Sequence, residues 1–204
     1  MQHSDIRIVK TREANWNGES RGKAFLTFGG FSVDPVTAGG RRVVTSPLPA
    51  LPARKIEFLG DSITAGYCNA CHDGSSSDNF NPDMGDNAES FVNSWPTQIC
   101  DTLGAQCHTT AWSGLGLVAN CCGFPRAEEA VASGGRGGPL GDGSHLMPAI
   151  FHRTLATDGD TSWEWSTWIP DALVINLGTN DGASAGTPEY LAAYTDLVTE
   201  AFAN

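Results

Sequence analysis

Ser62 is the residue of this chain best suited to nucleophilic chemistry. It follows a short apolar run from Lys55 to Leu59 and then the pair Gly60 and Asp61. Such a run predicts a parallel strand, and open α/β sheets hold their reactive groups where the strands end. Glycine permits a tight turn, and a helix that begins at this point directs backbone N–H groups toward an anion. A serine in this position is a candidate nucleophile, and it needs a general base.

Two further groups of small and polar residues also follow predicted strands. The strand near 106–111 leads to Trp-Ser-Gly-Leu-Gly at 112–116, and the strand at 172–177 leads to Gly-Thr-Asn-Asp at 178–181. Because the carboxyl ends of parallel strands meet at one edge of a sheet, we expect all three blocks to converge there.

The three blocks together could form half of an acyl-transfer site. Ser62 would attack an ester carbonyl. The backbone N–H groups of Ser62 and Gly114 and the side-chain amide of Asn180 would hold the resulting oxyanion. Gly116 follows the same strand and is the alternative to Gly114. Asp181 is expected to brace the loop by hydrogen bonding rather than to react.

The elements that must position these residues alternate between strands and helices. The three strands are expected at 55–59, 106–111 and 172–177. Helices are expected from Ser94 to a stop at Gly104, over 144–156, and from Thr187 onward. This alternation predicts a doubly wound parallel sheet, of which about three strands are present.

The first part of the chain has a different pattern. Residues 6–10 and 23–34 predict β-strands, and the proline-punctuated residues 45–54 predict an extended linker. So few strands cannot bury a sheet face alone. We therefore expect 1–44 to be a β-module that is cut short at its N-terminus, and 55–204 to be the α/β domain.

Charge and hydropathy exclude two classes of partner. The chain has 12 Lys and Arg against 23 Asp and Glu, and its net charge is −11. The basic residues are scattered, so no surface for a nucleic-acid backbone is predicted. No apolar run approaches the roughly 18 residues that a membrane span needs, and no membrane partner is expected.

Six cysteines lie close together, at positions 68, 71, 100, 107, 121 and 122. They predict disulfides and a secreted protein, although the pairing cannot be deduced from sequence. The run from Cys68 to His72 also matches a haem-attachment pattern and could begin a zinc site, but disulfides are favoured and no cofactor is expected. The first residues do not form a signal peptide, so a secreted protein would begin upstream of this chain.

The three blocks resemble those of the SGNH, or GDSL-type, hydrolases, in which they occur in this order. Within that family, residues 57–67 and 168–181 are similar to carbohydrate esterase family 2. Residues 6–15 resemble the late strands of the N-terminal jelly-roll domain of the same family. The resemblance covers nearly the whole chain, apart from its Cys-rich and Gly-rich insertions.

The resemblance implies a flavodoxin-like, three-layer domain that removes O-acetyl groups from plant polysaccharides such as xylan or glucomannan. It implies an acyl-enzyme intermediate on Ser62 and no metal. Trp168 and Asp181 are assigned to substrate binding on the same ground. Trp163 and Trp165 are either a further platform for sugar rings or buried core residues.

The family pattern also implies a motif that this sequence lacks. An Asp-x-x-His block should follow the Gly-x-Asn-Asp segment, and its histidine is the base for the serine. No such block follows Asp181, and no histidine follows His152. None of the remaining candidates, His72, His108, His145 and His152, is expected opposite Ser62. We therefore expect this chain to be truncated at its C-terminus as well and to be almost inactive; the alternative is a non-catalytic carbohydrate-binding protein.

Overall fold

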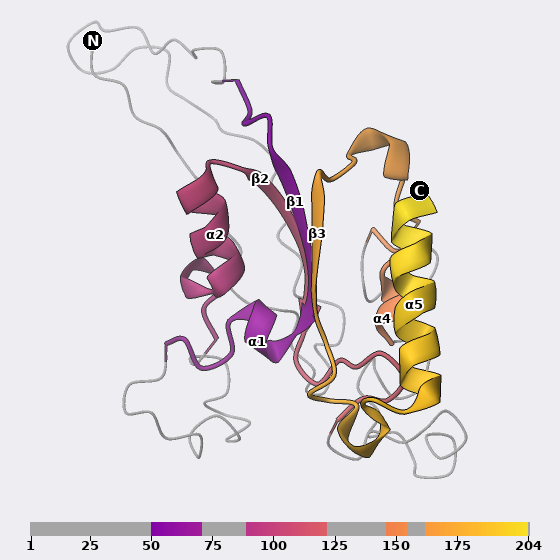
Figure 1. Cartoon of the computed structure of the whole chain (residues 1–204). Helices are drawn as coiled ribbons and strands as arrows, with labels where there is room; N and C mark the ends of the chain where they lie inside the picture. Colours follow the sequence, from indigo (N-terminus) through magenta and orange to yellow (C-terminus); the bar gives the residue numbers. More distant parts are fainter. Residues whose placement is uncertain (1–49, 71–88, 122–145, 155–161, 204) are drawn as a thin grey trace, which may run out of the picture.

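The computed structural model describes residues 50–70, 89–121, 146–154 and 162–203 (Figure 1). The predicted N-terminal strands lie outside the described residues. The elements, in chain order, are β1 (Lys55–Asp61), α1 (Ser62–Ala65), η4 (Phe91–Asn93), α2 (Trp95–Leu103), β2 (Gln106–Trp112), α4 (Met147–Ile150), η5 (Trp165–Thr167), β3 (Ala172–Asn176), η6 (Gly182–Ser184) and α5 (Pro188–Ala203).

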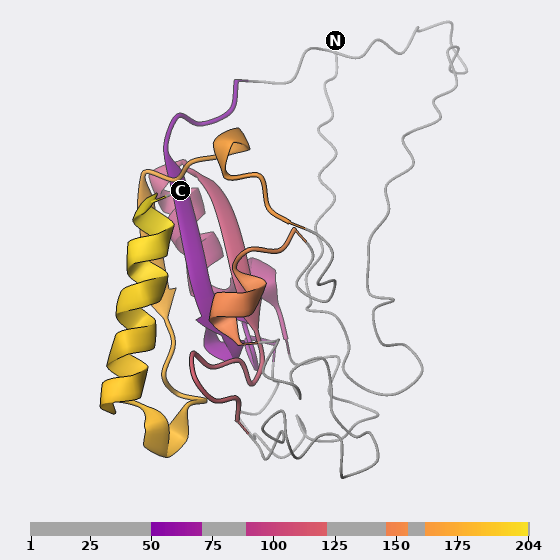
Figure 2. The same cartoon turned by 90° about the vertical axis from the view of Figure 1, so that its right-hand side faces the viewer.

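The three strands form a parallel sheet in the order β2-β1-β3, which confirms the predicted α/β class. Ile56 of β1 lies opposite Cys107 of β2 and Ala172 of β3. Helices α1 and α2 cover one face of the sheet, and α4 and α5 cover the other (Figures 1 and 2). Because all strands run in the same direction, all three end at the edge where α1 begins.

The core lies mainly between the sheet and the α4–α5 layer. Its buried members are Leu59, Trp112, Leu115, Leu117, Met147, Ile150, Phe151, Tyr190 and Leu197. On the opposite face Phe58 is fully buried and meets Trp95 of α2 edge to face, with ring centroids 5.1 Å apart. Burial of each large apolar side chain contributes roughly 1.5–3 kcal/mol to the stability of the fold. Side chains of β1 therefore stabilise the packing of both helix layers on the sheet.

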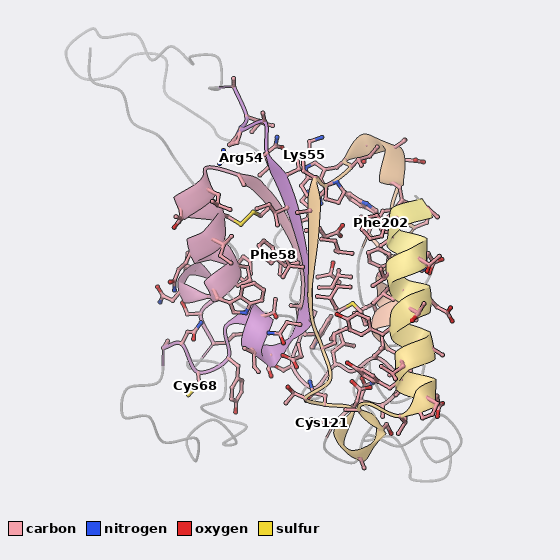
Figure 3. The ribbon with its side chains drawn as sticks, viewed as in Figure 1. Arg54, Lys55, Phe58, Cys68, Cys121 and Phe202 are labelled. Carbon is pink, nitrogen blue, oxygen red and sulfur yellow. A yellow bond between two sulfur atoms is a disulfide. The ribbon has the colours of Figure 1, made fainter. Side chains whose placement is uncertain are left out.

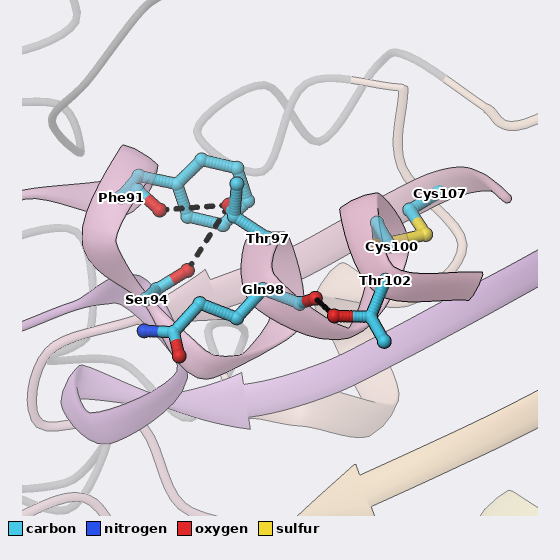
Figure 4. Close-up of a disulfide and its surroundings, with 7 residues drawn as sticks. All are labelled: Phe91, Ser94, Thr97, Gln98, Cys100, Thr102 and Cys107. Carbon is cyan, nitrogen blue, oxygen red and sulfur yellow. Dashed lines mark hydrogen bonds between the residues drawn. A yellow bond between two sulfur atoms is a disulfide. The ribbon is translucent and has the colours of Figure 1, made fainter. Parts of the chain in front are cut away.

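The helix boundaries follow the local sequence signals in part. α2 begins after Ser94 and ends at Gly104, whose φ of +56° suits glycine. The Ser94 hydroxyl lies 3.3 Å from the Thr97 hydroxyl and makes no capping bond to the backbone (Figure 4). The helix expected over 144–156 is far shorter within its described part, because α4 spans only Met147–Ile150.

A disulfide joins Cys100 of α2 to Cys107 of β2 (Figure 4). Cys68 and Cys121 are also disulfide-bonded. These bonds confirm the prediction of disulfides, and they occupy the sulfur of Cys68 that a haem or zinc site would have used. The rest of that pattern, Cys71 and His72, lies outside the described residues. No helix among the described residues is long and apolar enough to cross a membrane.

Glu57 is a buried acid in the middle of the apolar run of β1. Its side chain is only 7% exposed, and burial raises its pKa from 4.5 to about 7. A carboxyl whose pKa is higher in the folded than in the unfolded chain destabilises the fold when it ionises. The free energy of unfolding should therefore fall as the pH rises from 4.5 to about 7.

Glu57→Gln is expected to remove this penalty. At about pH 8 the variant should be more stable than the parent chain by on the order of 1–3 kcal/mol, and near pH 5 the two should be alike. Urea unfolding at both pH values measures the difference, with the exposed Glu189→Gln as the matched control. An equal effect of the two substitutions at both pH values would show that Glu57 carries no burial penalty.

Candidate active site

Ser62 lies at the edge of the sheet where the strands end, as the first residue of α1. The Asp61 carboxylate caps this helix, because its Oδ1 accepts a hydrogen bond from the Ile63 N–H at 2.9 Å. The helix ends after four residues at Gly66, whose N–H donates to the Ser62 carbonyl at 3.0 Å. With a single turn, the helix supplies individual unsatisfied N–H groups rather than a large dipole. The start of a helix at this point agrees with the sequence expectation.

From the sequence, Gly60 is expected to permit a tight turn. The structure gives a different reason for a glycine at this position. Its φ is not positive, but a Cβ at this position would lie 2.0 Å from Oγ1 of Thr64 in α1. Thr64 is fully buried. The absence of a side chain therefore lets α1 fold back onto the end of β1, and this contact places Ser62 at the sheet edge.

The second block forms a tight loop in which the two candidate glycines differ. Gly116 donates its N–H to Oδ1 of Asn120 at 2.9 Å. Gly114 is buried with φ +82°, and within the described residues its N–H donates no hydrogen bond. A substrate oxyanion needs a donor that has no other acceptor. The geometry therefore favours Gly114 over Gly116 as the backbone donor.

Asn180 links all three blocks through its side-chain amide. Nδ2 donates to the Leu115 carbonyl at 2.8 Å and to Oδ2 of Asp61 at 3.2 Å. Both amide protons are thus engaged, and the bond to Asp61 is the longer one. An oxyanion beside Ser62 would have to replace Asp61 as the acceptor of that proton.

Asp181 holds the second block in place. Its carboxylate is 4% exposed and accepts hydrogen bonds of 2.7–3.1 Å from the N–H groups of Leu117, Val118 and Ala119. These are the contacts of a bracing residue. The Asp181 charge also acts on Asp61, whose pKa is raised mainly by burial and further by this neighbouring charge. Both carboxylate oxygens of Asp181 are thus engaged by the loop, whereas the resemblance implies a contact with the substrate.

Neither histidine in the described part of the chain lies beside Ser62. His108 is four residues before the end of β2, about 13 Å from the sheet edge at the rise of a strand. Burial lowers its pKa, and the charge of Lys55 adds to the decrease. His152 pairs with Glu200 near the end of α5, at the opposite end of the sheet (Figure 1). His72 and His145 lie outside the described residues.

Trp168 is not brought to Ser62. It precedes β3, so it lies at the end of the sheet where the strands begin, and it is 9% exposed. Its ring stacks on His108 with centroids 3.8 Å apart, and Trp163 meets the same imidazole edge to face. Trp165 packs against Phe151. These contacts favour the interpretation of the tryptophans as core residues over a sugar platform at Ser62.

The structure also assigns a role to residues that the sequence did not single out. Asp61 both caps the nucleophile helix and orients Asn180, and the Leu115 carbonyl holds the same amide. In the sequence, the role of Asp61 was indicated only by its position beside Ser62. The role of the Leu115 carbonyl could not be indicated, because every residue has a backbone carbonyl. Among the described residues, no group of three or more His, Cys, Asp or Glu side chains could hold a metal ion.

Comparison with known proteins identifies similar sequences and folds. Residues 56–204 match the family model described as GDSL-like Lipase/Acylhydrolase. The cellulase/esterase CelE of Acetivibrio thermocellus is 34% identical over 165 residues, which cover 79% of this chain and 17% of that protein. The acetylxylan esterase / glucomannan deacetylase of Cellvibrio japonicus is 26% identical, over 92% of this chain and 43% of that protein.

A solved structure supports the same comparison. A family two carbohydrate esterase from Clostridium thermocellum, in complex with cellohexaose, superposes with a TM-score of 0.57 at 31% identity. The match covers 78% of this chain and 41% of that one. The chain therefore spans less than half the length of each of these relatives.

Proposed function

Because the chain belongs to the GDSL-like lipase/acylhydrolase family, with family two carbohydrate esterases among its relatives, we propose that it carries the nucleophile half of a polysaccharide deacetylase. The substrate would be an acetylated plant-type polysaccharide such as xylan or glucomannan. A relative is named as acetylxylan esterase / glucomannan deacetylase, which supports this substrate class. The disulfides of the chain support an oxidising, extracellular setting.

The observation that carries the proposal is the convergence of the three blocks on Asn180. Its amide touches the residue before Ser62 and the residue after Gly114. This convergence supports a site in which a serine hydroxyl, a backbone donor and an amide donor act together, which is the arrangement that acyl transfer requires.

The reaction follows from these groups. The Ser62 hydroxyl oxygen attacks the acetyl carbonyl while a base takes its proton. The oxyanion is stabilised by the N–H groups of Ser62 and Gly114 and by Asn180. Collapse breaks the bond to the sugar oxygen, which receives the proton, and leaves acetyl-Ser62. Water then attacks the acetyl group and releases acetate, which restores the serine.

The general base is the part that the described residues do not provide. Loss of the histidine from a serine hydrolase costs on the order of 10⁶ in turnover. We therefore propose that the 204-residue chain is almost inactive as it stands. Its activity would require the histidine of an Asp-x-x-His block such as the family pattern implies.

A second function, non-catalytic carbohydrate binding, is favoured by the same lack of a histidine beside Ser62 in the described part of the chain. Acetate release from acetylated xylo- and glucomanno-oligosaccharides, measured beside Ser62→Ala, tests both functions. Binding of these oligosaccharides, with equal and negligible acetate release by the two proteins even when a base is supplied, would favour the binding protein. Ser62-dependent release of acetate would favour the esterase.

Asn180→Ala is expected to lower turnover by about 10²–10³ when a base is supplied, because it removes one oxyanion donor. The loss should fall on kcat, since the oxyanion exists only after the attack. Asn93→Ala, which changes an exposed amide in η4, is the control and should leave turnover unchanged. A rise in KM without a loss of kcat would assign Asn180 to substrate binding instead.

A further inference from the structure

A cavity lies at the opposite end of the sheet from Ser62. Its volume is about 380 Å³, and it is lined by residues at the beginnings of β1 and β3, in η5 and the segment that follows it, and at the end of α5. Figure 3 shows Lys55 and Phe202 at this end of the molecule. Glu57, in its wall, is four residues before Asp61, a separation of about 13 Å along β1. The cavity is therefore separate from the candidate active site.

Glu57 is the polar group that distinguishes this cavity. The side chain is more than nine-tenths buried and lines the cavity, and within the described residues it makes no hydrogen bond or ion pair. A buried carboxylate is costly unless a donor or a cation pairs with it. The described residues supply neither, so the ionised carboxylate would be stabilised by a positively charged or donating ligand.

The charges around the cavity favour a cation. Among the described residues that line it, the other ionisable one is Asp171, which is also acidic, and none is a Lys or Arg. One carboxylate oxygen of Asp171 accepts the Lys55 backbone N–H at 2.8 Å. The nearest described ammonium group, Nζ of Lys55, lies 5.9 Å from the Trp168 ring centroid. The described lining therefore carries negative charge, and the Lys55 ammonium lies beside it, over the Trp168 ring, rather than at Glu57.

The remaining walls are aromatic and aliphatic. Indole and phenyl rings come from Trp165, Trp168 and Phe202, and aliphatic groups come from Ile169, Pro170 and Leu173. Phe202 is 83% exposed and Ile169 is 58% exposed at the rim. Aromatic rings attract cations through their faces, and apolar walls accept the alkyl groups that a substituted ammonium carries. A sugar would find too few hydrogen-bonding side chains here.

We propose that this cavity binds a small organic cation of the alkylammonium class, with its charged nitrogen at Glu57 and its alkyl groups against the aromatic wall. The site is independent of the proposed deacetylase function. It uses none of the residues at Ser62, so either proposal can fail without the other.

Choline and its uncharged carbon analogue, 3,3-dimethylbutan-1-ol, form a matched pair of probes because they differ in the charged atom. Isothermal titration of the 204-residue chain should show choline binding at least about tenfold more tightly than the alcohol. Equal affinity for the two probes, or no measurable binding of choline, would overturn the proposal. Tighter binding of a neutral oligosaccharide that Glu57→Gln weakens would assign the cavity to sugars instead.

Glu57→Gln should weaken choline binding by about tenfold or more, because the amide keeps the shape and loses the charge. Glu189→Gln, in the first turn of α5 and outside the cavity, should leave it unchanged. Glu57→Gln is expected to stabilise the fold, so a loss of binding with an unchanged or raised Tm would report on the site itself. Retained choline affinity in Glu57→Gln would contradict the assignment.

Discussion

Free imidazole is expected to give this chain an acetyl-esterase activity that depends on Ser62. The described residues hold the proposed nucleophile and the proposed oxyanion donors but place no histidine beside them, because His108 and His152 lie elsewhere in the fold. Imidazole in solution can take the Ser62 proton during attack and return it to the departing sugar oxygen. A general base contributes about 10²–10⁴ to such steps, so acetate release at least tenfold above the control is expected.

Ser62→Ala is the control for this experiment, because imidazole also hydrolyses esters without a protein. Acetylated oligosaccharides should be used, since their alkyl esters react slowly with imidazole alone. Equal acetate release by the parent chain and Ser62→Ala at every imidazole concentration would contradict the proposal that the site lacks only its general base. Ser62-dependent release without imidazole would show that the chain holds its own base, and His72→Ala and His145→Ala would then identify it.

Asp181→Ala is expected to cause the largest loss of stability among the variants considered. The substitution leaves the buried N–H group of Leu117 and the partly buried N–H groups of Val118 and Ala119 without their acceptor. Each unsatisfied buried donor costs about 1–3 kcal/mol, so a total of roughly 3–5 kcal/mol is expected once the loop has relaxed. Urea unfolding at neutral pH measures the loss.

Asp171→Ala is the matched control, because it removes an exposed carboxylate that accepts one backbone N–H. This substitution should lower the free energy of unfolding by about 1 kcal/mol. If both substitutions cost the same, Asp181 does not brace the loop. Asp181→Asn, which keeps one acceptor oxygen, should fall between the two.

The sheet and the convergence of the three blocks were predictable because their signals are local. Apolar runs predicted β1 and β3, and the carboxyl ends of parallel strands lie at the same edge of a sheet. Gly104 ended α2 as expected because a left-handed residue there favours glycine. These inferences needed no knowledge of distant contacts.

The remaining features depend on contacts between distant parts of the chain. Asp61 and Asn180 are 119 residues apart, and their hydrogen bond could not be anticipated from either motif. Glu57 stands in an apolar run, but its lack of a partner becomes visible only when β3 and α5 enclose it. Trp168 belongs to the same motif as Asn180, yet β3 separates the two and places them at opposite ends of the sheet.

The most direct test of the central claim is the mass of the protein after reaction with an acetylated oligosaccharide in the presence of imidazole. Rapid acid quenching, digestion and peptide mass spectrometry locate any acetyl group on the chain. The account predicts one acetyl group on the peptide that contains Ser62, and none on the same peptide from Ser62→Ala. Acetylation absent from Ser62, or found equally in both proteins, would contradict the assignment of Ser62 as the nucleophile.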